Sequence, residues 1–182
     1  MKMNMRRNIC VLAVVAVILS AGDVSASNLG YPADICAKYV AWSGAFGVPG
    51  MNELTPAYSI EDGGNEVLEI DGIAISYDKN VSETQRVYMM LLEDGSDQPY
   101  QVMKFCALVA ALEYDDYPVE WSFYESCEMM GRVNPAFELL CGAVNECRED
   151  LENGKYIAFY TGRNGTYYLT YKDTLGWGII IN

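Results

Sequence analysis

Two short turn signals frame a helical block, and this arrangement constrains the fold more than any other feature of the sequence. Asp71-Gly72 and Asn164-Gly165 each stand between apolar runs, as in the tight turns of β-hairpins, whose central residues need positive φ. Between them, residues 98–151 carry apolar side chains at spacings of three and four, which indicates helices. We therefore predict an α+β domain. It has an antiparallel sheet of about six strands, covered on one face by three sequential amphipathic helices.

The first turn also predicts a register. It pairs Ile70 with Ile73, so that one face of the hairpin is apolar without interruption. Residues 85–92 are apolar on both faces and too few for an average helix, which favours a central strand. After the helical block, we expect strands at 156–160, 166–171 and 177–181, and we expect residues 44–65 to form an ordered loop.

The helix boundaries follow from capping residues. A short helix is expected from Pro32 to about Trp42, and a long one over 98–114. A second long helix covers 119–130, with Phe123, Cys127 and Met130 on its apolar stripe, and Gly131 ends it. Asn134-Pro135 then begins a third, which Asn153-Gly154 closes.

Residues 1–26 have the features of a secretory signal peptide. Basic residues precede an uncharged run from Ile9 to Ala21, and Val24-Ser25-Ala26 supplies small residues for cleavage. The run is shorter than the ~20 residues that span a bilayer. We expect cleavage after Ala26, a single domain over 27–182, and a periplasmic or secreted protein with no membrane insertion once the signal is removed.

Charge and composition exclude several functions. The chain of 182 residues has a net charge of −13. Of its 12 basic and 25 acidic residues, cleavage would leave 9 and 24, a net charge of −15. The electrostatic field of this negative charge disfavours nucleic-acid binding and attracts cationic partners. The alternative is that the charge only keeps an exported protein soluble. With no histidine, the chain lacks Ser-His and Cys-His pairs, mixed Cys/His zinc sites and histidine-ligated haem. We expect no cofactor and no metal.

Five cysteines remain after cleavage, which is an odd number in an oxidising compartment. Cys106 and Cys127 lie about equally far from the turn between two predicted antiparallel helices, which predicts a disulfide. Cys141 and Cys147 are six residues apart and would lie on different faces of one helix. Cys36 would therefore pair with one of them, for which we favour Cys141, and the other would remain an inert buried thiol.

No motif identifies a function, and three classes of protein compete. A binding protein is favoured, such as an inhibitor or immunity-type partner of a basic protein, because tyrosine offers large rigid contact area. Its expected surface is formed by Tyr156, Tyr160, Tyr167, Tyr171 and Asp173. The alternative that these tyrosines are core residues stays open.

The second class is a small carboxylate-dependent, glycosidase-like hydrolase, because such chemistry needs two carboxylates and no histidine. Its candidate residues are Asp115, Asp116, Glu120 and Glu125, and a solvated acidic turn is the simpler interpretation. The third class is a structural or surface module without catalytic activity. The lack of repeats and of a lipid-attachment motif disfavours it. Catalysis is thus not expected, but the sequence does not exclude it.

Overall fold

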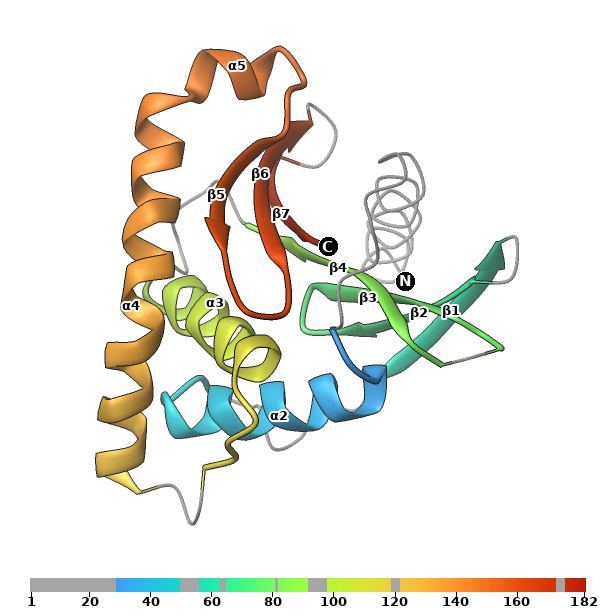
Figure 1. The fold of residues 1–182 in the computed structure, drawn as a ribbon, viewed down its shortest axis with the longest axis vertical. Coiled ribbons are helices and arrows are strands. Elements are labelled where there is room, and N and C mark those ends of the chain that lie inside the picture. Colours follow the sequence, from blue (N-terminus) through green and yellow to red (C-terminus); the bar gives the residue numbers. More distant parts are fainter. Residues whose placement is uncertain are drawn as a thin grey trace, which may run out of the picture.

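The computed structural model describes residues 29–49, 56–62, 65–80, 82–91, 98–118, 122–172 and 176–182 (Figure 1). The expected signal peptide and its cleavage site lie outside these residues. Within the described part of the chain, no helix is both long and apolar enough to cross a membrane.

The strands form a single antiparallel sheet with the order β1-β2-β3-β4-β7-β6-β5. Four strands precede the helical block, namely β1 (Ala57–Asp62), β2 (Asn65–Ile70), β3 (Ile73–Asp78) and β4 (Thr84–Met90). Three follow it, namely β5 (Ile157–Thr161), β6 (Thr166–Lys172) and β7 (Gly176–Ile181). The α+β class and the shared antiparallel sheet are confirmed. The seventh strand is β1, which lies where the turn-rich sequence predicted a loop and pairs with β2.

The β2–β3 hairpin has the predicted register. Ile70 pairs with Ile73 and Leu68 with Ile75, and both turn residues have positive φ, 51° at Asp71 and 78° at Gly72. The turn is also docked onto the helices. The Asp71 carboxylate accepts a hydrogen bond from the Tyr39 hydroxyl at 2.9 Å and forms an ion pair with Lys104 at 2.9 Å.

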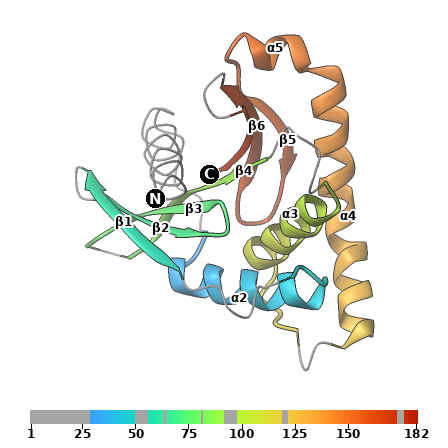
Figure 2. The ribbon, with the colours of Figure 1, turned by 180° about the vertical axis from the view of Figure 1, so that it is seen from behind.

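Three helices cover one face of the sheet, as Figures 1 and 2 show from opposite sides. They are α2 (Pro32–Ala45), α3 (Gln98–Glu113) and α4 (Phe123–Glu146), and the short α5 (Arg148–Glu152) follows. Alternate strand residues point at these helices, including Ile73 and Ile75 of β3, Leu169 of β6 and Ile179 of β7, all fully buried. The core therefore lies between the sheet and the helices.

Helix α3 is not amphipathic, contrary to the prediction. Every residue from Phe105 to Glu113 is buried, because α3 contacts both α2 and α4 and faces the sheet core. The buried residues around this helix include small ones such as Ala107 and Ala110. A helix enclosed by other elements needs no polar face.

Helix α4 replaces the two helices predicted on either side of Gly131. It runs without interruption for 24 residues and has Pro135 in its interior. Its buried residues are Met129, Val133, Ala136, Leu140 and Ala143. The predicted stripe is wrong, because Phe123 and Cys127 are exposed.

The predicted disulfides are not present, and all five cysteines of the described residues are free. Cys106 and Cys36 are buried in the core, whereas Cys127 and Cys141 lie on exposed positions of α4. The symmetric placement of Cys106 and Cys127 about the turn assumed that both face the same helix-helix interface. The continuous α4 instead directs Cys127 to solvent. Burial raises the pKa of the Cys36 thiol to about 12 and that of Cys106 to about 11, so both are unreactive at neutral pH.

Candidate functional site

The tyrosines expected to form a binding face have different environments. Tyr167 is fully buried in the core. Tyr160 and Tyr171 are half-buried, the first against the Tyr167 ring and the second against Trp177. Tyr156 is 40% exposed, and Asp173 lies outside the described residues. The structure therefore does not bring these four tyrosines together on an open surface.

A bulge in β5 explains how two consecutive aromatic residues of the β5–β6 hairpin point to the same side of the sheet. The pairing with β6 shifts between Ala158 and Tyr160, and such a bulge turns consecutive side chains toward one side. Phe159 is buried in the core and contacts the Tyr167 ring at 6.3 Å between centroids, while Tyr160 packs against the same ring. In a regular strand, the neighbours Phe159 and Tyr160 would point to opposite faces of the sheet.

A buried carboxylate ties this hairpin to the helices. Glu113, the last residue of α3, is 4% exposed. It accepts a hydrogen bond from the Tyr167 hydroxyl at 2.8 Å and from the Asn164 backbone N–H at 2.9 Å. Burial, followed by the charge of Glu113, raises the pKa of Tyr167 well above its usual value, so Tyr167 remains a donor. Glu113 and Tyr167 are both buried, so neither side chain is accessible to a substrate.

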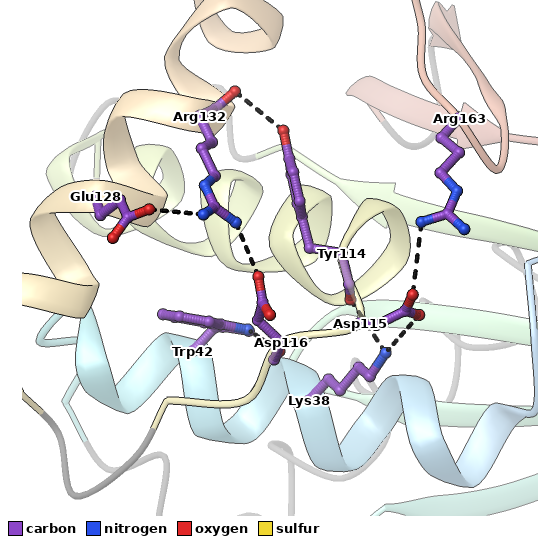
Figure 3. Close-up of polar contacts among 8 residues, drawn as sticks. All are labelled: Lys38, Trp42, Tyr114, Asp115, Asp116, Glu128, Arg132 and Arg163. Carbon is purple, nitrogen blue, oxygen red and sulfur yellow. Dashed lines mark hydrogen bonds and ion pairs between the residues drawn. The ribbon is translucent and has the colours of Figure 1, made fainter.

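Two of the four carboxylates considered for hydrolysis, Asp115 and Asp116, bind different partners (Figure 3). A third, Glu125, lies in the first turn of α4. Asp115 faces Lys38 at 3.8 Å and Arg163 at 3.5 Å, whereas Asp116 pairs with Arg132 at 2.8 Å. Arg132 also binds Glu128 at 2.6 Å. Glu120 lies outside the described residues. The two aspartates therefore do not face a common space in which a sugar could bind between them.

The connection from α3 to α4 is held on α2 by backbone contacts. Lys38 donates to the Tyr114 carbonyl at 3.1 Å, and the Trp42 indole N–H donates to the Asp116 carbonyl at 3.1 Å (Figure 3). The Tyr114 hydroxyl donates to the Arg132 carbonyl of α4 at 3.3 Å. Contacts with α2 and α4 thus hold the first residues after α3, Tyr114 and Asp116, in place.

Large aromatic side chains are exposed where α4 begins. Phe123 is 80% and Tyr124 87% exposed, and Tyr117 on the connection is 46% exposed. The Ser122 hydroxyl caps the helix by accepting from the Glu125 N–H at 3.1 Å. The Ser126 hydroxyl, one turn further on, donates to the Ala45 carbonyl of α2 at 3.0 Å. The start of α4 is therefore anchored while its two aromatic residues face solvent.

We call this region, residues 114–118 and 122–128, the α3–α4 corner. It combines these aromatic side chains with the exposed carboxylates of Asp115, Asp116 and Glu128. Sequence reasoning missed it because Phe123 was assigned to the core. Two adjacent aromatic residues directly after a helix cap were an available signal, since both cannot lie on one narrow apolar stripe.

No group of histidine, cysteine and acidic side chains in the described residues could hold a metal ion. Comparison with known proteins finds no matching family model, no matching curated protein and no matching solved structure.

Proposed function

We propose that the protein is an exported acidic binding protein that recognises a basic protein partner through the α3–α4 corner. The observation that carries the proposal is the exposure of Phe123 and Tyr124, 80% and 87%, on an anchored helix start. An inhibitor or immunity-type protein is the subclass that we favour, because such proteins act by occupying a partner's surface.

The aromatic side chains suit the centre of a protein interface. Phenylalanine and tyrosine bury large areas while losing little conformational entropy, and aromatic residues are enriched among interface residues. Single exposed apolar residues are common, but Phe123 and Tyr124 are consecutive and Tyr117 belongs to the same corner. The anchored backbone lowers the entropy lost on binding.

The surrounding charges favour a cationic partner. The side chains of Asp115, Asp116 and Glu128 are 83%, 60% and 67% exposed, and the chain carries a net charge of −13. Exposed ion pairs such as Asp116–Arg132 are weak, so lysine or arginine side chains of a partner can compete for these carboxylates. Charge complementarity of this kind mainly accelerates association and makes it depend on salt.

Affinity capture from the exported proteins of the native host tests the proposal. We expect the wild-type protein to retain a protein of high isoelectric point at low salt and to release it at high salt. The double variant Phe123→Ala/Tyr124→Ala should lose at least tenfold in retention, because it removes the central contact area.

The matched control is Tyr100→Ala/Tyr156→Ala, which removes two tyrosines that are each 40% exposed outside the corner. It should retain the same partner as the wild type. Equal retention by all three baits, or no basic protein released by salt, would reject the proposal.

A further inference from the structure

An open pocket lies at the other end of α4, away from the α3–α4 corner. It has a volume of about 410 Å³ and is lined by residues of α3 and α4, by Leu91 directly after β4, and by Trp177 near the start of β7. Three aromatic side chains form part of its wall, namely Phe105 of α3, Phe137 of α4 and Trp177 of β7. Its size is in the range of small-molecule sites, roughly 300–1,000 Å³.

The lining specifies a chemical class of ligand. Aliphatic side chains such as Val102, Leu140 and Val144 fill the spaces between the rings, and the amides of Gln101 and Asn145 supply polar atoms. None of the described residues that line the pocket is charged. An ionised ligand would therefore lose hydration and meet no opposite charge among these described lining residues.

Arg148 lies beside the pocket but places no charge inside it. Its guanidinium lies over the Trp177 ring, 5.9 Å from the ring centroid. Its Nε pairs with the Glu152 carboxylate at 3.0 Å, both side chains are exposed, and neither belongs to the lining. The strongly acidic chain as a whole further disfavours an anion.

We propose that this pocket binds a neutral aromatic molecule with a small polar substituent. The rings of Phe137 and Trp177 would contact the aromatic part, and the Asn145 amide would bind the polar group. An engineered apolar cavity of about 150 Å³ accepts benzene, so about 410 Å³ leaves room for a fused or two-ring molecule. This site is separate from the proposed protein interface and does not depend on it.

Two fluorescent probes with the same ring system test the proposal. N-phenyl-1-naphthylamine is neutral, whereas 1-anilinonaphthalene-8-sulfonate carries one negative charge. We expect the neutral probe to bind the purified protein saturably with one site per chain, and the sulfonate to bind at least tenfold more weakly. Equal affinity for the two probes, or no saturation, would overturn the assignment.

A pair of tryptophan variants on α4 locates the site. Val144→Trp fills the pocket and should weaken binding of the neutral probe at least tenfold. Leu139→Trp adds the same side chain at a position of the same helix that is 50% exposed and outside the lining, and should leave binding unchanged within twofold. Equal effects of the two variants would place the probe elsewhere.

A measurement on the unmodified chain keeps the test decisive if a variant does not fold. Cys141 lines the pocket, whereas Cys127 is an exposed cysteine of the same helix outside it. Saturating neutral probe should slow alkylation of Cys141 by iodoacetamide at least fivefold under reducing pretreatment, with no change at Cys127. Unchanged or equal protection of the two thiols would contradict the proposed site.

Discussion

At the scale of single residues, the buried carboxylate of Glu113 joins the end of α3 to the β5–β6 hairpin. An unpaired carboxylate is costly to bury, so its contacts with Tyr167 and the Asn164 N–H are needed for stability. The Asn164 side chain adds a hydrogen bond to the Leu112 carbonyl at 2.8 Å. Gly162 completes the arrangement, because a Cβ there would collide with the Glu113 carboxyl group.

This geometry makes Glu113 and Gly162 energetically coupled. Glu113→Ala should lower the free energy of unfolding by about 2–3 kcal/mol, because it leaves buried donors without an acceptor. Gly162→Ala should cost about 1–2 kcal/mol, because the new methyl group displaces the carboxylate from its partners. The double variant should cost at least about 1 kcal/mol less than the two single variants together, since the collision disappears with the carboxylate.

Urea denaturation of the four proteins at neutral pH measures this coupling. Glu113→Gln is the matched control. Its amide can accept from the Asn164 N–H and donate to the Tyr167 oxygen, so it should be less destabilising than Glu113→Ala. Strictly additive costs would show that Gly162 does not accommodate the carboxylate.

At the scale of elements, the continuity of α4 is the main departure from the sequence prediction. Gly131 and Pro135 are local signals for a helix end and a helix start. They are overridden because Met129, Val133 and Ala136 continue one buried stripe through the expected break. Core packing along the whole stripe outweighs the cost of a proline inside the helix.

Two substitutions distinguish one helix from two. Gly131→Ala should stabilise the protein by about 0.5–1 kcal/mol, because Gly131 is an ordinary helical position. The added methyl group would have nothing within 4 Å. Pro135→Ala should stabilise it by about 1–3 kcal/mol, because it restores a backbone donor in the helix interior.

Thermal or urea unfolding of Gly131→Ala and Pro135→Ala measures these changes in stability. If a turn separated two helices here, Gly131 would have a left-handed backbone and its replacement would destabilise the protein. Loss of stability in Gly131→Ala would therefore contradict the continuous helix.

Elements that depend on neighbouring residues were predictable, and those that depend on distant ones were not. The predicted pairing of Ile70 with Ile73 was correct, because the residues of the Asp71-Gly72 turn themselves determine it. The proposed bridge between Cys106 and Cys127 was wrong because it required the rotation of α4 about its axis, which is determined by packing. The bulge at Phe159 was likewise not predictable, because the alternation of side chains along a regular strand does not reveal an inserted residue.

At the scale of the whole molecule, the helical block is inserted between two antiparallel meanders that share the β4–β7 pair. The sequence predicted one antiparallel sheet with strands on both sides of the helices from the turn signals, but it did not predict that β4 pairs with β7. It did not predict the α3–α4 corner, whose aromatic and acidic residues depend on how Tyr114 and Asp116 are held against α2 and α4. The expected tyrosine face of the sheet is largely occupied by packing around Tyr167.

The most direct test of the proposed function is hydroxyl-radical footprinting of the protein alone and in complex with the basic partner obtained by affinity capture. The method reports the solvent exposure of individual aromatic side chains. We expect oxidation of Phe123 and Tyr124 to slow at least fivefold in the complex, while Tyr100 and Tyr156 react at unchanged rates. Protection of Tyr156 with unchanged oxidation of Phe123 and Tyr124 would contradict the account and return the binding surface to the β5–β6 hairpin.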